Sequence, residues 1–157
     1  MQRYGPAVLR VVVGATFALH GAQKLFGAFG GGGLAATADF LSTLGLSPAW
    51  PLALALGVVE LGGGLLLVAG AFTVVAAAAL AVDMVIAVWL VHYAQGFFLR
   101  WWLAPGGGLG YEYNVVLIAA LVSLMLTGPG VFSIDGRRAR SAEAEAYGRA
   151  RLRAGKM

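Results

Sequence analysis

Four long apolar stretches dominate the hydropathy pattern of the chain. They cover about residues 6–27, 48–70, 72–95 and 111–127. A membrane-spanning helix needs about 20 mostly apolar residues to cross about 30 Å of hydrocarbon. Each stretch approaches that length and has glycine or proline near its ends, as helix boundaries do. The pattern predicts a four-span membrane domain over residues 1–136, followed by a tail over residues 137–157.

The connections between these stretches differ in length. Gly70 and Ala71 alone separate the second stretch from the third, so those two should form a tight antiparallel hairpin. The link between the first two contains four glycines and then residues 34–45, where leucines and alanines recur at helical spacing. We expect a short helix there, on the membrane surface. The predicted fold class is all-α: an integral membrane four-helix bundle with a short interfacial helix between spans 1 and 2.

Composition supports a membrane protein. Hydrophobic residues make up 60% of the chain and charged residues 11%, with a mean hydropathy of +0.83. A soluble domain is about half apolar and about a quarter charged. The chain has no cysteine, which excludes disulfide and thiol chemistry of its own.

The net charge of +4 belongs to the tail. Seven of the eleven Lys and Arg residues lie beyond residue 135, so the charge does not indicate a nucleic-acid partner. We expect a solvated, partly disordered tail in which residues 141–145 can start a helix. As an alternative, its arginines bind a soluble partner or anionic lipid.

Orientation follows from the basic residues near the span ends. An even number of spans places both termini on one side, and the basic residues are concentrated on that side. The positive-inside rule makes it cytoplasmic. As an alternative, the first stretch is a cleaved signal peptide, although His20 is a poor residue for a cleavage region.

Ionisable and polar residues inside the spans are the strongest functional signal. A charge at the membrane centre costs at least about 2.5–3.5 kcal/mol, and Glu60 and Asp83 lie near the middle of their spans. The remaining polar residues fall toward the predicted outer ends of the spans. One outward-facing pocket for a ligand or protons would draw on His20, Gln23, Lys24, Glu60, His92 and Glu112. A second group of candidates consists of Asp83, Tyr111, Tyr113 and Asn114. No catalytic residue and no metal site is assigned.

Helical phase separates two of these candidates. His92 follows Asp83 by nine positions, which is half a turn at about 100° per residue. If His92 faces the pocket, Asp83 should face elsewhere, toward a partner subunit in a homodimer. The alternative is that Asp83 is protonated and hydrogen-bonded within the helix packing.

Structural explanations compete with the functional ones. Lys24 could extend to the head groups as an interfacial anchor, and His92 and Glu112 could lie just outside the hydrocarbon. Glu60 is far from either end of its span, so we expect it to be functional or ion-paired, with Lys24 as a candidate partner.

The sequence HGAQKLFG at residues 20–27, ELGGG at residues 60–64 and GYEY at residues 110–113 together form a specific pattern. With Arg10 and the closing GPG at residues 128–130, they make the chain resemble the DoxX family of small four-span bacterial membrane proteins. The similarity extends over about residues 5–136. It implies a multi-pass protein of the bacterial plasma membrane. Family relatives include the membrane subunits of an archaeal thiosulfate:quinone oxidoreductase, and membrane partners in assemblies that manage oxidative or thiol stress.

Two functions follow from the pocket and the resemblance. The leading hypothesis is a redox-associated membrane subunit that binds quinone near the outer leaflet. It would have no intrinsic cofactor or redox centre and would receive electrons from a soluble or membrane oxidoreductase partner. The alternative is a non-enzymatic membrane scaffold or small-molecule transporter, in which the polar residues clasp the helices together.

Overall fold

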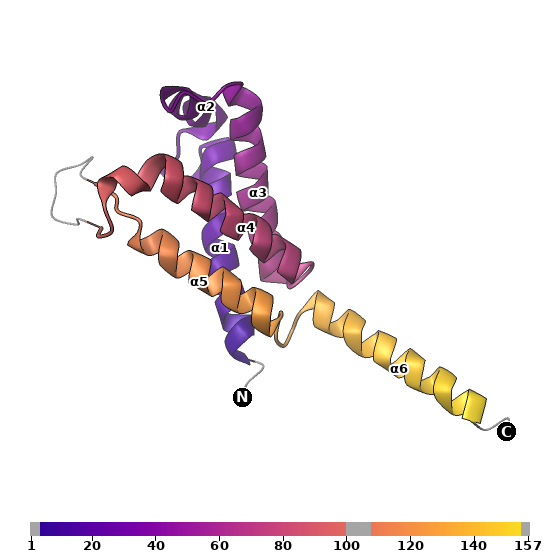
Figure 1. Ribbon diagram of the computed structural model, residues 1–157. Helices are drawn as coiled ribbons and strands as arrows, with labels where there is room; N and C mark the ends of the chain where they lie inside the picture. The colour runs from indigo at the N-terminus through magenta and orange to yellow at the C-terminus, as the bar shows by residue number, and fades with distance from the viewer. Residues whose placement is uncertain (1–3, 100–107, 155–157) are drawn as a thin grey trace.

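The protein is an all-α membrane protein (Figure 1). The structure, a computed structural model, describes residues 4–99 and 108–154. Its α-helices are α1 (Tyr4–Phe26), α2 (Gly33–Thr43), α3 (Ala49–Ala69), α4 (Thr73–Ala87), α5 (Glu112–Thr127) and α6 (Ile134–Ala154). A 3-10 turn, η1 (Ala28–Gly30), follows α1, and α4 continues into a π-helical turn, η2 (Val88–His92), and a 3-10 turn, η3 (Tyr93–Gln95).

The helices agree closely with the predicted spans. In the described part of the chain, α1, α3 and the continuous helix over Thr73–Gln95 are long and apolar enough to cross a membrane. The fourth, α5, has 16 residues and is therefore only about 24 Å long at about 1.5 Å per residue. It is shorter than the hydrocarbon layer, which measures about 30 Å.

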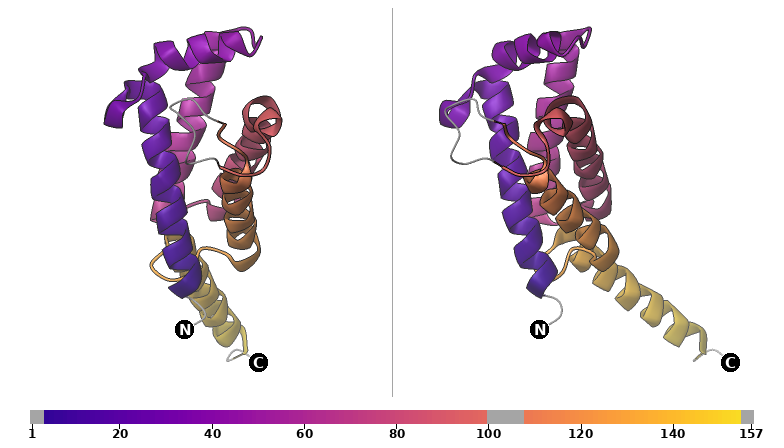
Figure 2. Two further views of the ribbon diagram at one scale, coloured as in Figure 1. Left: turned by 90° about the vertical axis from the view of Figure 1, so that its left-hand side faces the viewer. Right: turned by 60° about the vertical axis from the view of Figure 1, so that its left-hand side comes forward.

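The four long helices form two pairs that open like a wedge. α1 and α3 run side by side, and α4 and α5 form a second pair that leans across them (Figures 1 and 2). The pairs meet near the N-terminus and the α3–α4 turn and separate toward α2 (Figure 2). The buried core where they meet includes Phe17, Leu67, Leu80, Leu121 and Leu124.

Glycine allows α1 and α3 to approach closely. A Cβ atom on Gly14 would lie 2.7 Å from the carbonyl oxygen of Gly64, so no larger side chain fits there. Gly21 is equally crowded by the backbone of Leu61. Small residues at such crossings give membrane helices their contact area, because lipid provides no hydrophobic drive. Gly64 is crowded in the same way, since a Cβ atom there would lie 2.5 Å from the carbonyl oxygen of Gly14.

The predicted short helix is present as α2, which lies across the end of α1 and α3 (Figure 2). Ala38 and Leu41 are buried against Ala53 of α3. The hydroxyl group of Thr37 donates to the carbonyl oxygen of Lys24 at 3.2 Å and to that of Gly33 at 2.9 Å. These contacts fix α2 against the end of the α1–α3 pair.

Arg10 holds the opposite end together. It lies in α1, its exposed fraction is 2%, and its guanidinium group donates to five backbone carbonyls. The acceptors are Leu67, Val68, Pro129, Val131 and Phe132. Arg10 therefore joins the last turn of α3 to the segment between α5 and α6, and it satisfies carbonyls that no helix would satisfy.

Asp135 adds a second bond to the same junction. Its carboxylate accepts hydrogen bonds from the backbone N–H of Phe72 at 3.0 Å, and from the N–H and hydroxyl of Thr73, both at 2.9 Å. It thereby caps the N-terminus of α4. Partial burial by itself raises the pKa of Asp135, but the bonds from Thr73 and Phe72 and the charge of Arg138 lower it overall. Because both residues join α3 and α4 to the segment before α6, we call Arg10 and Asp135 the junction clasp.

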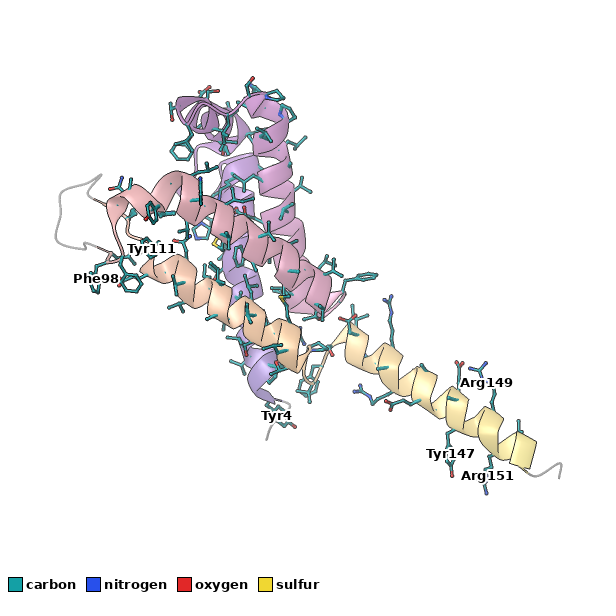
Figure 3. All side chains as sticks on the ribbon, viewed as in Figure 1. Tyr4, Phe98, Tyr111, Tyr147, Arg149 and Arg151 are labelled. Atoms are coloured by element: carbon teal, nitrogen blue, oxygen red, sulfur yellow. The ribbon has the colours of Figure 1, made fainter. Side chains whose placement is uncertain are left out.

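The tail differs from the expectation of partial disorder. It forms one helix, α6, which starts at Ile134 rather than near Ser141 and points away from the bundle (Figure 1). Figure 3 shows the side chains of Tyr147, Arg149 and Arg151 projecting from it, clear of the other helices. The anchoring of Asp135 on the α3–α4 turn explains why the helix starts so early.

Candidate functional site

A cavity of about 940 Å³ lies between the two helix pairs. α1, α2, α3, α4 with η2, and α5 all contribute to its wall. Most of that wall is apolar, and its larger apolar residues include Phe17, Phe40, Leu56, Ile86, Leu90 and Leu117. The wedge arrangement explains the cavity, because the pairs diverge toward α2 and no helix of the described residues fills the space between them.

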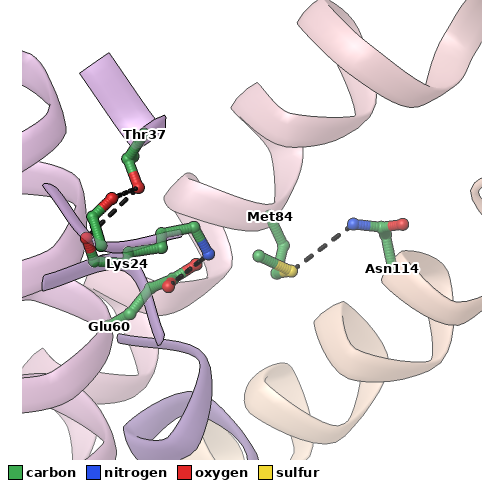
Figure 4. A network of polar contacts seen from close by, with 6 residues as sticks. Lys24, Thr37, Glu60, Met84 and Asn114 are labelled. Carbon is green, nitrogen blue, oxygen red and sulfur yellow. Dashed lines mark hydrogen bonds and ion pairs between the residues drawn. The ribbon is translucent and has the colours of Figure 1, made fainter. Parts of the chain in front are cut away.

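Lys24 and Glu60 form an ion pair in the wall of this cavity (Figure 4). The Nζ atom of Lys24 lies 2.8 Å from Oε1 and 2.6 Å from Oε2 of Glu60. Glu60 is 3% exposed. The pair joins α1 to α3, so the expectation that Glu60 is ion-paired is confirmed. Lys24 points inward, and the alternative of a head-group anchor is wrong.

Asp83 also lines the cavity, which contradicts the expectation that it faces away from His92. The expectation assumed an α-helix throughout. The residues Val88–His92 instead form a π-helical turn, which holds more residues per turn than an α-helix. Each residue of this turn therefore rotates the chain by a smaller angle than an α-helical residue does, so His92 is less than half a turn from Asp83. Both side chains line the same cavity. The side chain of Asp83 points into the cavity, so its direction gives no support for a subunit interface.

The carboxyl group of Asp83 has an oxygen atom without a hydrogen-bond partner among the described residues. This atom is Oδ2, and it is buried. Its charged neighbours are Glu60 and Lys24. We call Lys24, Glu60 and Asp83 the charged cluster. It contains two carboxyl groups but one ammonium group, so its charges balance only when a proton or a ligand contributes.

Two histidines also line the cavity. His20 comes from α1 and is exposed. The Nδ1 atom of His92 lies 2.7 Å from the carbonyl oxygen of Leu109. A carbonyl oxygen only accepts, so Nδ1 carries a proton, and in the neutral ring Nε2 keeps a free lone pair.

The first turn of α5 adds Tyr113 and Asn114 to the wall. Asn114 is buried, and its Nδ2 atom donates to the sulfur of Met84 at 3.6 Å (Figure 4). The amide oxygen of Asn114 is left as an acceptor. Tyr113, Asn114 and Asp83 all belong to the second group of candidates. The pocket therefore has more polar side chains than the first group alone predicted.

Three predicted residues do not line the cavity. The Nε2 atom of Gln23 donates to the carbonyl oxygen of Phe29 at 3.3 Å and supports the turn after α1. The backbone N–H of Glu112 donates to the carbonyl oxygen of Phe97 at 2.9 Å. The ring of Tyr111 stacks on Tyr93 with 6.4 Å between centroids. Tyr111 lies next to Phe98 at the end of α5 (Figure 3). All three shape the end of the bundle rather than the pocket.

Sequence reasoning missed the role of Arg10 and the apolar wall supplied by α2. Arg10 counted only toward the charge bias and the family pattern, although an arginine two turns inside an apolar helix is itself a signal of burial with partners. No group of three or more His, Asp or Glu residues suited to a metal ion occurs in the part of the chain that the structure describes.

Comparison with known proteins gives two matches. Residues 5–93 match the DoxX family, a segment that contains Lys24, Glu60, Asp83 and His92. A Haemophilus influenzae (strain ATCC 51907 / DSM 11121 / KW20 / Rd) protein described as an uncharacterized protein is 32% identical over 142 residues, which cover 87% of this chain and 95% of that protein. No solved structure matches the chain.

Proposed function

Because the chain belongs to the DoxX family of membrane proteins, we propose that it is a redox-associated membrane subunit whose cavity binds a quinone or a similar flat apolar molecule. One observation carries the proposal: a largely apolar cavity of about 940 Å³ has a charged cluster in its wall, inside the bundle. Ligand sites usually measure about 300–1,000 Å³ and combine an apolar wall with a few polar groups. The alternatives are a small-molecule transporter or a scaffold.

Different cavity residues contact the apolar part of such a ligand, its ring and tail, and the polar oxygens of its head group. The apolar wall from α2, α4 and α5 holds the ring and the tail. Lys24 uses two of its ammonium protons on Glu60, and the third can meet a ligand oxygen. Asp83 and the two histidines can hold or release protons beside the head group. Electrons come from a soluble or membrane oxidoreductase partner.

The charge distribution supports an orientation in which the cavity is near the outer leaflet. Arg10 lies in the first half of α1 and Lys24 in its last turn. The arginine-rich helix α6 extends from the end of the bundle where α1 begins (Figure 1). We therefore propose a bacterial plasma-membrane protein with both termini in the cytoplasm.

Binding to the detergent-purified protein tests the proposal. A radiolabelled decyl-substituted benzoquinone should bind with one molecule per chain. Ala87→Phe fills the cavity from α4 and should weaken binding at least about tenfold, equivalent to about 1.4 kcal/mol. Ala119→Phe is the matched control, because Ala119 is exposed on α5 outside the cavity. Absence of binding, or equal binding by the two variants, contradicts the proposal.

A scaffold role predicts a different outcome. If the ion pair between Lys24 and Glu60 only joins α1 to α3, Glu60→Gln lowers stability and leaves no ligand-specific effect. Glu112→Gln is the matched control, since Glu112 lies outside the cavity wall. A decrease in quinone affinity for Glu60→Gln in excess of that for Glu112→Gln, in protein that remains folded, favours the binding function.

A further inference from the structure

The polar groups of the cavity differ in how much hydrogen-bonding capacity they keep. Lys24 uses two of its three ammonium protons on Glu60. Asn114 directs its amide N–H toward Met84. The Nδ1 proton of His92 is used on Leu109. Most donors of these three side chains are therefore engaged within the protein, and one ammonium proton of Lys24 and one amide proton of Asn114 remain.

The acceptors of the same cavity are largely free. The Oδ2 atom of Asp83 is buried and has no partner among the described residues. The amide oxygen of Asn114 and, in the neutral ring, Nε2 of His92 also remain as acceptors. Asp83 is the strongest of the three, because a carboxyl oxygen that is buried without a donor keeps its full desolvation cost.

We propose that the cavity binds a head group that donates hydrogen bonds, with Asp83 as its main acceptor. The inference rests on the proposed function and sharpens it. Between the two oxidation states of a quinone, it selects the reduced dihydroxy form, the quinol. The same donor chemistry is available from a protonated amine on an apolar chain, which would also balance the second carboxyl group of the charged cluster.

The two oxidation states differ in what they offer to Asp83. An oxidised quinone presents two carbonyl oxygens, which only accept, so it leaves the Oδ2 atom of Asp83 unpaired. Each hydroxyl group of a quinol can donate to such an acceptor. The free ammonium proton of Lys24 can meet an oxygen of either form, but Asp83 pairs with the quinol alone. The site therefore disfavours the quinone, because the buried Asp83 oxygen then remains unsatisfied.

The experiment measures the affinity of detergent-purified full-length protein for three ligands with the same decyl tail: the benzoquinol, the benzoquinone and decylammonium. Titrations are anaerobic, so that the quinol stays reduced. The wild-type protein should bind the quinol at least about tenfold more tightly than the quinone. Asp83→Asn should remove this preference. Asp39→Asn, at an exposed position of α2, should retain it.

The outcomes separate this inference from the proposed function. Equal wild-type affinity for quinol and quinone overturns the inference and leaves the proposed quinone site intact. Binding of decylammonium alone, lost in Asp83→Asn, supports the donor-selective site and overturns the quinone function. Failure of all three ligands to bind overturns both. The wild-type ratio of quinol to quinone affinity decides the matter even if Asp83→Asn does not fold.

Discussion

The bundle buries charged side chains at two places, and in different ways. At the junction clasp, Arg10 donates to five backbone carbonyls, and Asp135 accepts three bonds at the start of α4. In the charged cluster, at the middle of the spans, Lys24 and Glu60 pair with each other, while Asp83 keeps an oxygen that has no partner among the described residues. The hydrogen-bonding groups of the clasp are saturated, and those of the cluster are not.

The difference shows how to separate structure from function among buried charges. A charge whose bonds are all made to its own backbone has no capacity left for a ligand, and removing it costs stability. A charged side chain that lies beside a cavity and has unused hydrogen-bonding capacity lowers stability slightly, and it remains available to bind a ligand. Both clusters occupy an apolar setting where a charge is expensive, so burial alone does not distinguish them.

The largest effect is expected for Arg10→Met. Each bond to a charged donor contributes about 1.5–3 kcal/mol, so losing five should cost at least about 5 kcal/mol and prevent folding. The yield of monodisperse protein and its thermal unfolding in detergent measure this effect. Arg10→Lys keeps the charge but not the planar set of donors and should fail nearly as badly. Arg151→Met, on the exposed side of α6, is the control, and equal stability of all three variants contradicts the role of the clasp.

A smaller loss of stability is expected for Lys24→Met. It leaves Glu60 buried without its counter-charge, which costs about 3 kcal/mol or more. Lys24→Met combined with Glu60→Gln should recover most of that loss, because the unpaired charge is gone. Thermal unfolding of the two single variants and the double variant gives the coupling. Additive losses show that the pair is not coupled.

Asp135→Asn should cost about 1 kcal/mol at neutral pH, the usual value of an N-cap. The pKa of Asp135 is lowered in the folded protein, so its charged form stabilises the fold above the unfolded carboxyl pKa of about 3.9. That contribution disappears as the pH falls through the lower folded value. The difference in unfolding temperature between wild type and Asp135→Asn should therefore shrink below about pH 4. Glu143→Gln, in exposed α6, should show no such difference at any pH.

The smallest effect on stability is expected for Asp83→Asn. It removes a negative charge beside Glu60 and replaces one carboxyl oxygen with an amide NH2 group, so stability should change by less than about 1 kcal/mol, in the stabilising direction. The comparison between the clasp and the charged cluster predicts this contrast with Arg10, although both side chains lie within apolar helices. A loss above about 2 kcal/mol would show that Asp83 is a structural residue.

The sequence predicted the helices and the ion pair because both depend on local signals. Apolar length with glycine or proline at the boundaries defines a span, and the depth of Glu60 makes an unpaired state costly. It failed at Asp83, because no residue preference indicates that the helix widens into a π-helical turn at Val88–His92. It also failed at Arg10, since the acceptors Pro129, Val131 and Phe132 lie far away along the chain.

Photoaffinity labelling tests the central claim most directly. An azido-substituted decylbenzoquinone is bound to the purified protein, irradiated, and located by peptide mass spectrometry. The account predicts labels on residues of the cavity wall, such as Thr16, Leu56, Ile86 or Leu117, and their loss in the Ala87→Phe variant. Labels concentrated around Arg10 and the α3–α4 turn, or spread evenly over the lipid-facing side chains, would contradict the account.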